Sequence, residues 1–382
     1  MTAAAWLAPA LAAAAAGAGA ARAWRSRLLE DLEYRREVRP TRLFPGDRAV
    51  LEITVENRKR LAVPWLVTED EVAEGVSVLA ARSWRAARGR RVWVQAWHVP
   101  GRHRVRRAFQ LVARERGWQP FGPVSLRAGD PFGLVAARRE PVDAEGGRRD
   151  GVVVLPRPLP LAAAEALSEY GRRGGAGWLH RDPANVVGLR PYTPGDPFRS
   201  IDWKATARAG GLRVRETAPW HAPSLVLVVD IATTRPVWLG RVRARQEAAL
   251  GVAAWFVLRA AGVGALRLHV NGGLLGEMAD VDLSLPPGGA PLALEALGRV
   301  AGAVRRPLAE TLRRMPPCPA EARVVVVTAL PDGEVWEAAH AAARRPFIVG
   351  VGAEAEGNPY VHARVGEEEV EAWWRACLAA AG

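Results

Sequence analysis

The chain has 382 residues, and 49% of them are hydrophobic. At roughly 100–200 residues per domain, this length predicts two globular units, each able to bury its own core. The two cysteines, Cys318 and Cys377, exclude a disulfide framework and match no metal-ligand spacing. They favour a reducing compartment.

The formal charge of +13 is carried almost wholly by arginine. Residues 23–158 hold 27 basic and 17 acidic residues, whereas residues 159–382 hold 25 and 23. The basic excess therefore belongs to the first unit, where it predicts attraction to an anionic membrane surface, nucleic acid or an acidic protein. A solvated arginine face that needs no partner is the alternative.

The N-terminus contains an uncharged run, Thr2–Ala21, which is followed by Arg22, Arg25 and Arg27. Twenty residues are about the length that crosses a bilayer as a helix. Arginines on the C-terminal side favour retention of that side in the cytoplasm. We therefore expect residues 1–27 to form an inner-membrane anchor with a basic juxtamembrane segment, and the soluble domains to face the cytoplasm. Because the run is mostly alanine, a soluble N-terminus is the alternative.

Residues 28–158 alternate between apolar and polar side chains, as in Ala49–Asn57. This period of two is typical of half-buried strands. Breaks such as Pro100-Gly101 separate several such segments, and Arg114–Glu140 is rich in glycine and proline. The pattern predicts an all-β domain, an antiparallel β-sandwich.

Residues 159–184 form a Gly/Arg-rich linker in this interpretation, and residues 185–382 form the second domain, with its signature segment and an α/β fold. Strand and helix patterns alternate after the linker, which predicts a doubly wound, Rossmann-type sheet with one antiparallel edge. Ligands of such sheets bind beyond the carboxyl ends of the strands, where Asp230 and Thr328 lie. The elements expected here are a strand over Leu225–Asp230, a helix over Arg241–Gly262, a hairpin turn at Asn271-Gly272 and helices over Leu292–Val304 and Leu308–Met315.

A dense motif, "GLRPYTPGDPFRSIDWKATARAGGLRVRE", lies at Gly188–Glu216. It resembles the signature of the domain-of-unknown-function 58 family. This resemblance implies a β-sandwich followed by a von Willebrand factor A-like domain, a membrane anchor and a partner of the MoxR-type AAA+ ATPase class. The matching residues are Arg190, Tyr192, Pro194, Gly195, Asp196, Arg199, Ile201, Asp202, Trp203, Ala207 and Arg208.

Arginines and aspartates alternate in this signature, which would allow a half-buried lattice of ion pairs. A fold-stabilising network and a partner-docking surface are the two interpretations. The first predicts that loss of Asp202 or Arg208 destabilises the domain more than loss of Asp230 does.

A von Willebrand factor A-like domain often binds Mg²⁺ through an Asp-x-Ser-x-Ser loop and oxygens on later strands. Here Asp230, Thr234 and Thr328 remain, but Ala232 and Ala329 have replaced two ligands. Mg²⁺ needs near-octahedral oxygen ligation, so this degenerate loop predicts no metal and no cofactor.

The chain has no P-loop, no His-Glu-x-x-His and no Gly-x-Ser-x-Gly motif. We therefore expect a non-enzymatic, membrane-tethered scaffold or adaptor that acts with a MoxR-type ATPase in protein assembly or maturation, as the resemblance implies. One alternative is a nucleic-acid-binding protein that uses the basic first domain, which the lack of interleaved exposed aromatics disfavours. The other is a hydrolase that uses Asp196 and Asp202.

Overall fold

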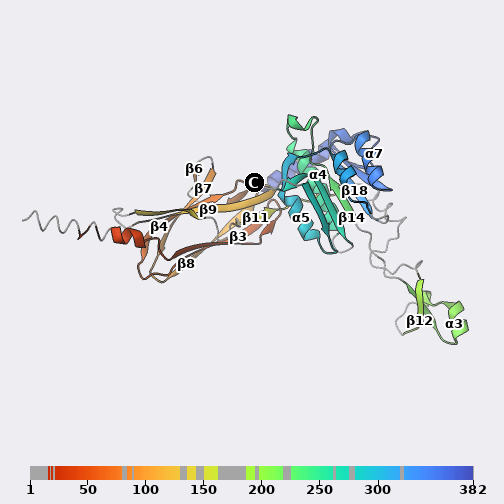
Figure 1. The fold of residues 1–382 in the computed structure, drawn as a ribbon, viewed down its shortest axis with the longest axis horizontal. Helices are drawn as coiled ribbons and strands as arrows, with labels where there is room; N and C mark the ends of the chain where they lie inside the picture. Colours follow the sequence, from red (N-terminus) through yellow and green to blue (C-terminus); the bar gives the residue numbers. More distant parts are fainter. Residues whose placement is uncertain are drawn as a thin grey trace, which may run out of the picture. The chain divides into compact units, whose positions relative to one another are not determined.

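The computed structural model describes most of the chain, and its fold is a mixed α/β fold with several sheets (Figure 1). Most of the predicted anchor and of the predicted linker lie outside the described residues. In the part that is described, no helix combines the length and the apolar character that a membrane crossing requires. The described residues are 16–17, 19, 22–79, 84–87, 90–129, 136–142, 150–161, 186–193, 198–217, 225–260, 264–274, 280–318 and 322–381.

The chain divides into two compact units. Unit 1 comprises residues 1–157 together with 295–301 and 374–382. Unit 2 comprises residues 158–294 and 302–373.

Unit 1 is built mainly from antiparallel strands whose side chains alternate between a buried and an exposed side. In β3, Leu51, Ile53 and Val55 are buried, whereas Glu52 and Thr54 face outward. This period of two produces one apolar face per sheet. One sheet has the order β1-β3-β8-β5 and the other the order β2-β11-β9-β4-β7-β6, with β10 beside β9. The strands are β1 (Leu32–Arg39), β2 (Arg42–Leu43), β3 (Arg48–Asn57), β4 (Val63–Val72), β5 (Val76–Val78), β6 (Trp84–Ala87), β7 (Arg90–Val99), β8 (Arg104–Ala113), β9 (Gly117–Gly129), β10 (Ala136–Val142) and β11 (Gly151–Val154).

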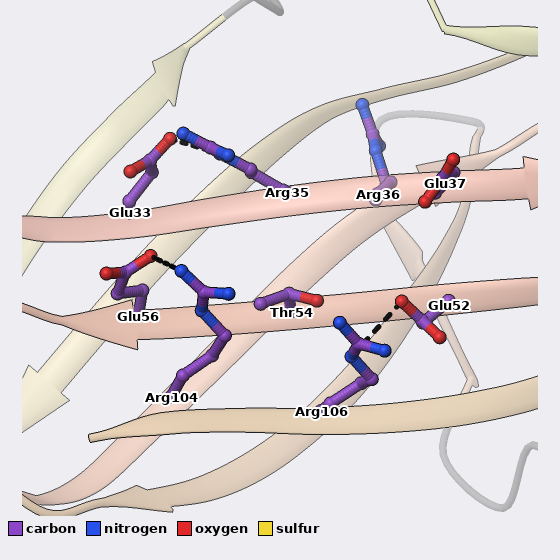
Figure 2. A pocket seen from close by; sticks show the side chains of 9 residues that line it. All are labelled: Glu33, Arg35, Arg36, Glu37, Glu52, Thr54, Glu56, Arg104 and Arg106. Carbon is purple, nitrogen blue, oxygen red and sulfur yellow. Dashed lines mark hydrogen bonds and ion pairs between the residues drawn. The ribbon is translucent and has the colours of Figure 1, made fainter.

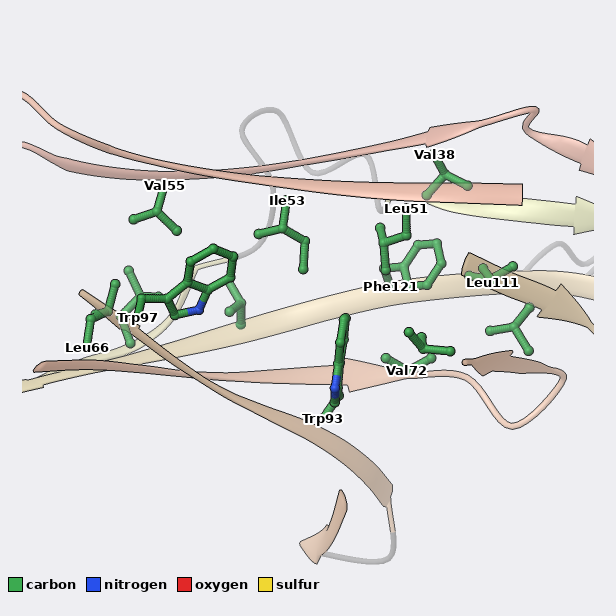
Figure 3. Packing of buried hydrophobic residues seen from close by; sticks show 14 of the residues in the cluster. Val38, Leu51, Ile53, Val55, Leu66, Val72, Trp93, Trp97, Leu111 and Phe121 are labelled. Carbon is green, nitrogen blue, oxygen red and sulfur yellow. The ribbon is translucent and has the colours of Figure 1, made fainter. Parts of the chain in front are cut away.

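Side chains from both of these sheets form one hydrophobic core (Figure 3). Trp93 and Trp97 of β7 and Phe121 of β9 are its largest members, and Trp93 meets Phe109 edge to face, with ring centroids 4.6 Å apart. The indole N–H of Trp97 donates to Thr68 Oγ1 over 3.1 Å, which satisfies a buried polar group. The strand tryptophans therefore serve packing.

A charged pair is buried inside unit 1. The Arg36 guanidinium contacts the Asp70 carboxylate, and both side chains are almost fully buried. Tyr34 Oη donates to the second oxygen of Asp70 over 2.8 Å. Burial raises the pKa of Asp70, while Arg36 and Tyr34 oppose that shift. The carboxylate is thus held by one cationic and one neutral donor.

Two arginines from the first 157 residues of unit 1 bind residues 295–301 of the same unit. Arg42 forms an ion pair with Glu295 over 2.7 Å. Arg116 Nη1 donates to the carbonyl oxygens of Leu297, Gly298 and Val300 over 3.0–3.1 Å. Leu297 and Gly298 lie in the last turn of α5, where carbonyls lack partners within the helix, and Val300 directly follows it.

The main sheet of unit 2 is parallel except at one edge. Its order is β16-β15-β14-β18-β19-β20, with β17 beside β15. β14 pairs in parallel with β15 and β18, and β19 pairs in parallel with β18 and β20. The edge strand β16 pairs antiparallel with β15. The strands of this unit are β12 (Val186–Pro191), β13 (Arg213–Thr217), β14 (Leu225–Val229), β15 (Leu266–Leu274), β16 (Asp280–Leu285), β17 (Val300–Val304, whose first residues belong to unit 1), β18 (Arg323–Thr328), β19 (Pro346–Val351) and β20 (Ala363–Val365).

Helices pack on this parallel sheet. Leu308 and Leu312 of α6 and Val335 of α7 share a core with Val226 and Val228 of β14. The alternate residues of β14 and β18 are buried as well, and α4 contacts both strands. Strands buried on both faces explain the continuous Val/Leu runs in the sequence. The helical elements are η1 (Phe198–Ser200), α3 (Trp203–Ala209), η2 (Val237–Leu239), α4 (Arg243–Ala260), α5 (Ala290–Arg299), α6 (Leu308–Arg314), α7 (Gly333–Ala342), η3 (Ala353–Ala355) and α8 (Glu367–Ala381).

Two local predictions in this unit are wrong. Asn271-Gly272 is no hairpin turn, because both residues lie inside β15 at an irregularity of its pairing with β16. The helix expected over Leu292–Val304 ends at Arg299, and Val300–Val304 form a strand beside β15. In both places tertiary contacts override the local propensity.

Candidate functional site

Asp230 immediately follows β14 at the carboxyl edge of the parallel sheet, and three donors occupy its carboxylate. Thr328 Oγ1 donates to Oδ2 over 2.8 Å. Asn271 Nδ2 and the Ala232 backbone N–H donate to Oδ1 over 2.6 and 2.9 Å. Both carboxylate oxygens are therefore engaged inside the protein.

We name Asp230, Asn271 and Thr328 the Asp230 cluster. All three side chains are buried. Burial raises the pKa of Asp230, since an anion loses its hydration there. The hydrogen bonds from Ala232, Thr328 and Asn271 act in the opposite direction. These three donors are neutral, whereas Asp70 contacts the cationic Arg36.

The Asp230 cluster continues into the next segment of chain. Asn271 Oδ1 accepts from the Ile231 N–H over 2.8 Å, and the buried Gln246 amide donates to the Ile231 carbonyl over 3.2 Å. Gly272 lies against Ile231: an added Cβ would meet its Cδ1 at 2.3 Å. A side chain at position 272 would thus have to displace the end of the buried Ile231 side chain.

The three residues of the predicted degenerate metal loop are not arranged as ligands. Asp230 and Thr328 are bonded to each other, and Thr234 Oγ1 donates to the Gly240 carbonyl over 2.6 Å. A Mg²⁺ ion needs free oxygen lone pairs in octahedral geometry. Within the described residues, no group of three or more His, Cys, Asp or Glu side chains could hold a metal ion. These residues do not fit a Mg²⁺ site.

The signature segment folds into a hairpin and a short helix. β12 pairs antiparallel with β13, and Ile201, which is buried, bridges to the buried Val214. Asp202 is the N-cap of α3: its Oδ1 accepts from the Ala205 N–H over 2.9 Å. Gly210, at φ 67°, ends that helix in the left-handed conformation that suits glycine.

Asp202 is half-buried and pairs with Arg215, an arginine outside the predicted lattice. Arg215 Nε lies 3.2 Å from Asp202 Oδ2. The Ala205 N–H lowers the pKa of Asp202 most, and Arg215 adds to the shift. Arg190 instead donates to the Pro191 carbonyl and to Thr193 Oγ1, each over 3.2 Å. The Asp202 carboxylate therefore caps the first turn of α3.

The remaining signature residues are described unevenly. Pro194, Gly195 and Asp196 lie outside the described residues, as does the side chain of Arg199. The Tyr192 ring lies near Phe198, with centroids 6.3 Å apart. Ala207 and Arg208 lie in α3, a helix with no buried residue, and Arg208 occupies its last turn.

Large apolar side chains of this segment face solvent. Phe198 is 73% exposed and Trp203 is 65% exposed, and Leu189 and Leu212 are exposed as well. A seven-residue helix without a buried face gains little from packing. The segment thus displays apolar surface that its own hairpin does not cover.

Strands β1, β3 and β8 of unit 1 line a pocket of about 410 Å³ (Figure 2). This pocket is lined by as many acidic as basic residues. Arg104 pairs with Glu56 over 2.8 Å, and Arg106 pairs with Glu52 over 3.2 Å. Glutamates therefore offset much of the predicted positive field on this face. Its lining residues are Glu33, Arg35, Arg36, Glu37, Glu52, Thr54, Glu56, Arg104 and Arg106.

Asn271 and Gln246 are the site residues that sequence reasoning missed. Asn271 was hidden by its Asn-Gly dipeptide, which is typical of a hairpin turn. Gln246 is a fully buried amide in the first turns of α4, which begins with arginines and continues into an apolar run, so no clear signal in the sequence marked it.

The chain is therefore a two-unit protein with a largely parallel α/β sheet and a separate signature hairpin. The model of the family described as "Protein of unknown function DUF58" matches residues 188–351, so the chain carries a DUF58 region. The resemblance predicted from Gly188–Glu216 is thus confirmed over residues 188–351.

Among curated proteins, the chain is similar to "Uncharacterized protein YeaD" of Bacillus subtilis (strain 168), with 29% identity over 207 residues. The match covers 53% of this chain and 48% of that protein, so the chain spans about half the length of this relative.

Two solved structures show weak similarity. One is the CARDB domain of the PF1109 protein in complex with di-metal ions from Pyrococcus furiosus, with 13% identity, coverage of 32% of this chain and 92% of that chain, and a TM-score of 0.21. The other is a beta-glucosidase from Listeria innocua in complex with isofagomine, with 16% identity, coverage of 32% and 16%, and a TM-score of 0.19. Scores this low establish neither a shared fold nor a shared function.

Proposed function

We propose that this chain is a non-enzymatic scaffold or adaptor whose signature segment docks a protein partner. The exposure of Trp203 and Phe198 on a segment with no buried helix face carries this proposal. Aromatic side chains contribute strongly to protein interfaces because they bury a large area at small entropic cost. A partner that covered them would also stabilise the short helix α3.

The partner that we propose is a MoxR-type AAA+ ATPase, the class that the family resemblance implies. The segment from Phe198 to Thr217 has five basic residues and two acidic ones. Charge complementarity then favours an acidic surface on the ATPase. The basic residues are Arg199, Lys204, Arg208, Arg213 and Arg215.

The finer architecture belongs to the same proposal. The two sheets of unit 1 would form a β-sandwich, and the parallel sheet of unit 2 would be of the von Willebrand factor A type. The Asp230 cluster would then lie where other domains of this type bind a metal ion, and its hydrogen bonds would replace that ion. Millimolar Mg²⁺ should then leave the melting temperature unchanged, because a ligand stabilises a protein only if the native state binds it. The location that we propose is the cytoplasmic face of the inner membrane, with the N-terminal segment as anchor.

The two other functions have less support. Arg104 and Arg106 of the basic strands pair with glutamates, which disfavours nucleic-acid binding by that face. Asp202 caps α3 by accepting the Ala205 N–H and pairs with Arg215, which disfavours a role as a catalytic acid or base.

The test is co-purification of the full-length chain with the MoxR-type ATPase of the same organism. Phe198→Ala/Trp203→Ala should lose the ATPase while its melting temperature stays close to that of the wild type, since both side chains are exposed. Trp238→Ala is the matched control: it removes an exposed indole elsewhere and should keep the ATPase. Equal retention by the double variant and the wild type would refute docking through this segment.

A further inference from the structure

The loop between β14 and α4 displays a second apolar surface, which the proposed docking through Trp203 does not use. Its single 3-10 turn, η2, consists of Val237, Trp238 and Leu239, which are 44%, 82% and 70% exposed. Val242 beyond the turn is exposed as well. We name residues 233–243 the Trp238 loop.

Hydrogen bonds hold the Trp238 loop in shape. The Val242 N–H donates to the buried Thr233 Oγ1 over 2.8 Å, and Thr234 Oγ1 donates to the Gly240 carbonyl over 2.6 Å. The Leu239 N–H closes the turn on the Pro236 carbonyl over 3.1 Å. The hydrogen bonds of the two threonines hold the base of the loop together. The backbone of the tip therefore already has a fixed conformation before it binds anything. Binding by such a preorganised tip costs little conformational entropy.

The geometry of the turn decides which environment suits the tip. A 3-10 helix has three residues per turn, so successive side chains project about 120° apart. Three consecutive apolar residues therefore make the turn apolar all the way round. A flat protein surface would cover one side of it, whereas the apolar part of a lipid layer surrounds an inserted tip. Tryptophan is also enriched at the membrane–water interface.

The charge around the tip points to an anionic surface. Residues 231–246 contain four arginines and no acidic residue. Asp332 and Glu367 pair with two of these arginines, Arg235 and Arg245, and the acidic Glu247 follows the segment, so part of this positive charge is offset. Basic side chains near an anionic leaflet strengthen binding to it.

We propose that the Trp238 loop inserts into an anionic lipid surface, with Trp238 and Leu239 at acyl-chain level and the arginines among the headgroups. This contact is separate from the N-terminal segment and from the docking of a protein partner. It would make unit 2 a peripheral membrane-binding module.

The test uses the full-length protein and vesicles of phosphatidylglycerol and phosphatidylcholine with brominated acyl chains, which quench nearby indoles. Because the chain has 15 tryptophans, Trp238 is isolated by difference from Trp238→Leu. The wild type should be quenched more than Trp238→Leu, and Trp203→Leu should keep the additional quenching seen in the wild type. Trp238→Ser/Leu239→Ser should bind these vesicles at least about tenfold more weakly than the wild type, since two apolar side chains leave the lipid.

Three comparisons make this experiment decisive. Phe198→Ser/Trp203→Ser should bind vesicles like the wild type, and any contribution of the N-terminal segment is common to all variants. Vesicles of phosphatidylcholine alone should bind the wild type less, and salt should weaken binding to the anionic ones. Equal quenching of the wild type and Trp238→Leu, or equal vesicle binding by the Trp238→Ser/Leu239→Ser variant, would overturn the proposal. So would a loop variant that loses a protein partner but keeps the vesicles, because the loop would then dock a protein.

Discussion

Each unit of the molecule buries one aspartate at the centre of a polar cluster, and the two are stabilised differently. In unit 1, Asp70 contacts the cationic Arg36 and the hydroxyl of Tyr34. In unit 2, Asp230 accepts from Thr328, Asn271 and a backbone N–H, all of them neutral. The Asp70 carboxylate is stabilised mainly by the opposite charge of Arg36. The Asp230 carboxylate is stabilised by three neutral hydrogen-bond donors.

This difference determines what a mutation leaves behind. Removal of Asp70 would leave a buried guanidinium without its closest counter-charge, which is among the costliest defects in a protein interior. Removal of Asp230 would leave neutral donors without an acceptor, which costs less per group. The variants below test this order, starting with the largest expected effect.

Asp70→Ala should lower the free energy of unfolding of unit 1 by about 3–5 kcal/mol, because Arg36 stays buried and loses its partner. Urea denaturation monitored by circular dichroism measures the change. Glu52→Ala, which breaks the exposed pair with Arg106, is the control and should cost less than about 1 kcal/mol. Arg36→Met/Asp70→Leu should recover most of the loss, since an apolar pair replaces both charges. A double variant as unstable as Asp70→Ala would contradict the charge-pair explanation.

Asp230→Ala should cost about 1–3 kcal/mol, because three buried donors lose their acceptor. The transition of unit 2 should shift in urea while that of unit 1 stays in place. Thr234→Ala removes a single hydrogen bond at a half-buried position and should cost less. The comparison fails if Asp230→Ala unfolds like the wild type.

The stability of unit 2 should also depend on pH through Asp230. Burial raises the pKa of this carboxyl in the folded state, so the folded protein holds the proton more tightly than the unfolded chain. The free energy of unfolding then falls as pH rises from the unfolded value of about 3.9 to the raised folded pKa. Asp230→Asn lacks this titration. The stability of the wild type relative to Asp230→Asn should therefore decline over that interval, and a constant difference would show that the folded pKa is not raised.

Asp202→Ala should lower the melting temperature less than Asp230→Ala does, because Asp202 caps α3 from a half-buried position whereas Asp230 is buried. Asp202→Asn keeps an N-cap side chain and loses only the charge that faces Arg215, so it should melt closer to the wild type. Calorimetry of the two variants side by side separates the cap from the ion pair. If Asp202→Ala proves more destabilising than Asp230→Ala, the order derived from burial is wrong.

This order reverses the one that the sequence predicts, and burial is the reason. Alternating arginines and aspartates suggested a half-buried lattice around Asp202, but charge patterns do not tell how deeply a segment lies. The sequence placed Asp230 and Thr328 at the carboxyl edge of the sheet, but it assigned Asn271 to a turn. Asn271 lies inside β15, and sequence spacing does not show that this strand brings it to the other two residues.

The elements with strong periodicity were predictable. The strand in Ala49–Asn57, the buried strand before Asp230 and the helix in Arg241–Gly262 all occur, with small shifts at their ends. The errors lie where a tertiary contact competes with local preference. Arg116 binds the carbonyls at the end of α5, where the helical pattern continues into a strand. Its partners are 181–184 positions away in sequence, so no local pattern could reveal them.

The discontinuity of unit 1 has a consequence for biosynthesis. Residues 295–301 belong to this unit, yet the ribosome adds them long after residue 157. At about 5–20 residues per second, the wait is on the order of ten seconds or more. During that time the nascent chain has all of its early strands, but Arg42 and Arg116 have no Glu295 and no helix end to bind. Unit 1 therefore reaches its complete form only after residues 295–301 and 374–382 have been synthesised, and a chaperone that shields its strands in the meantime would raise the yield of folded protein.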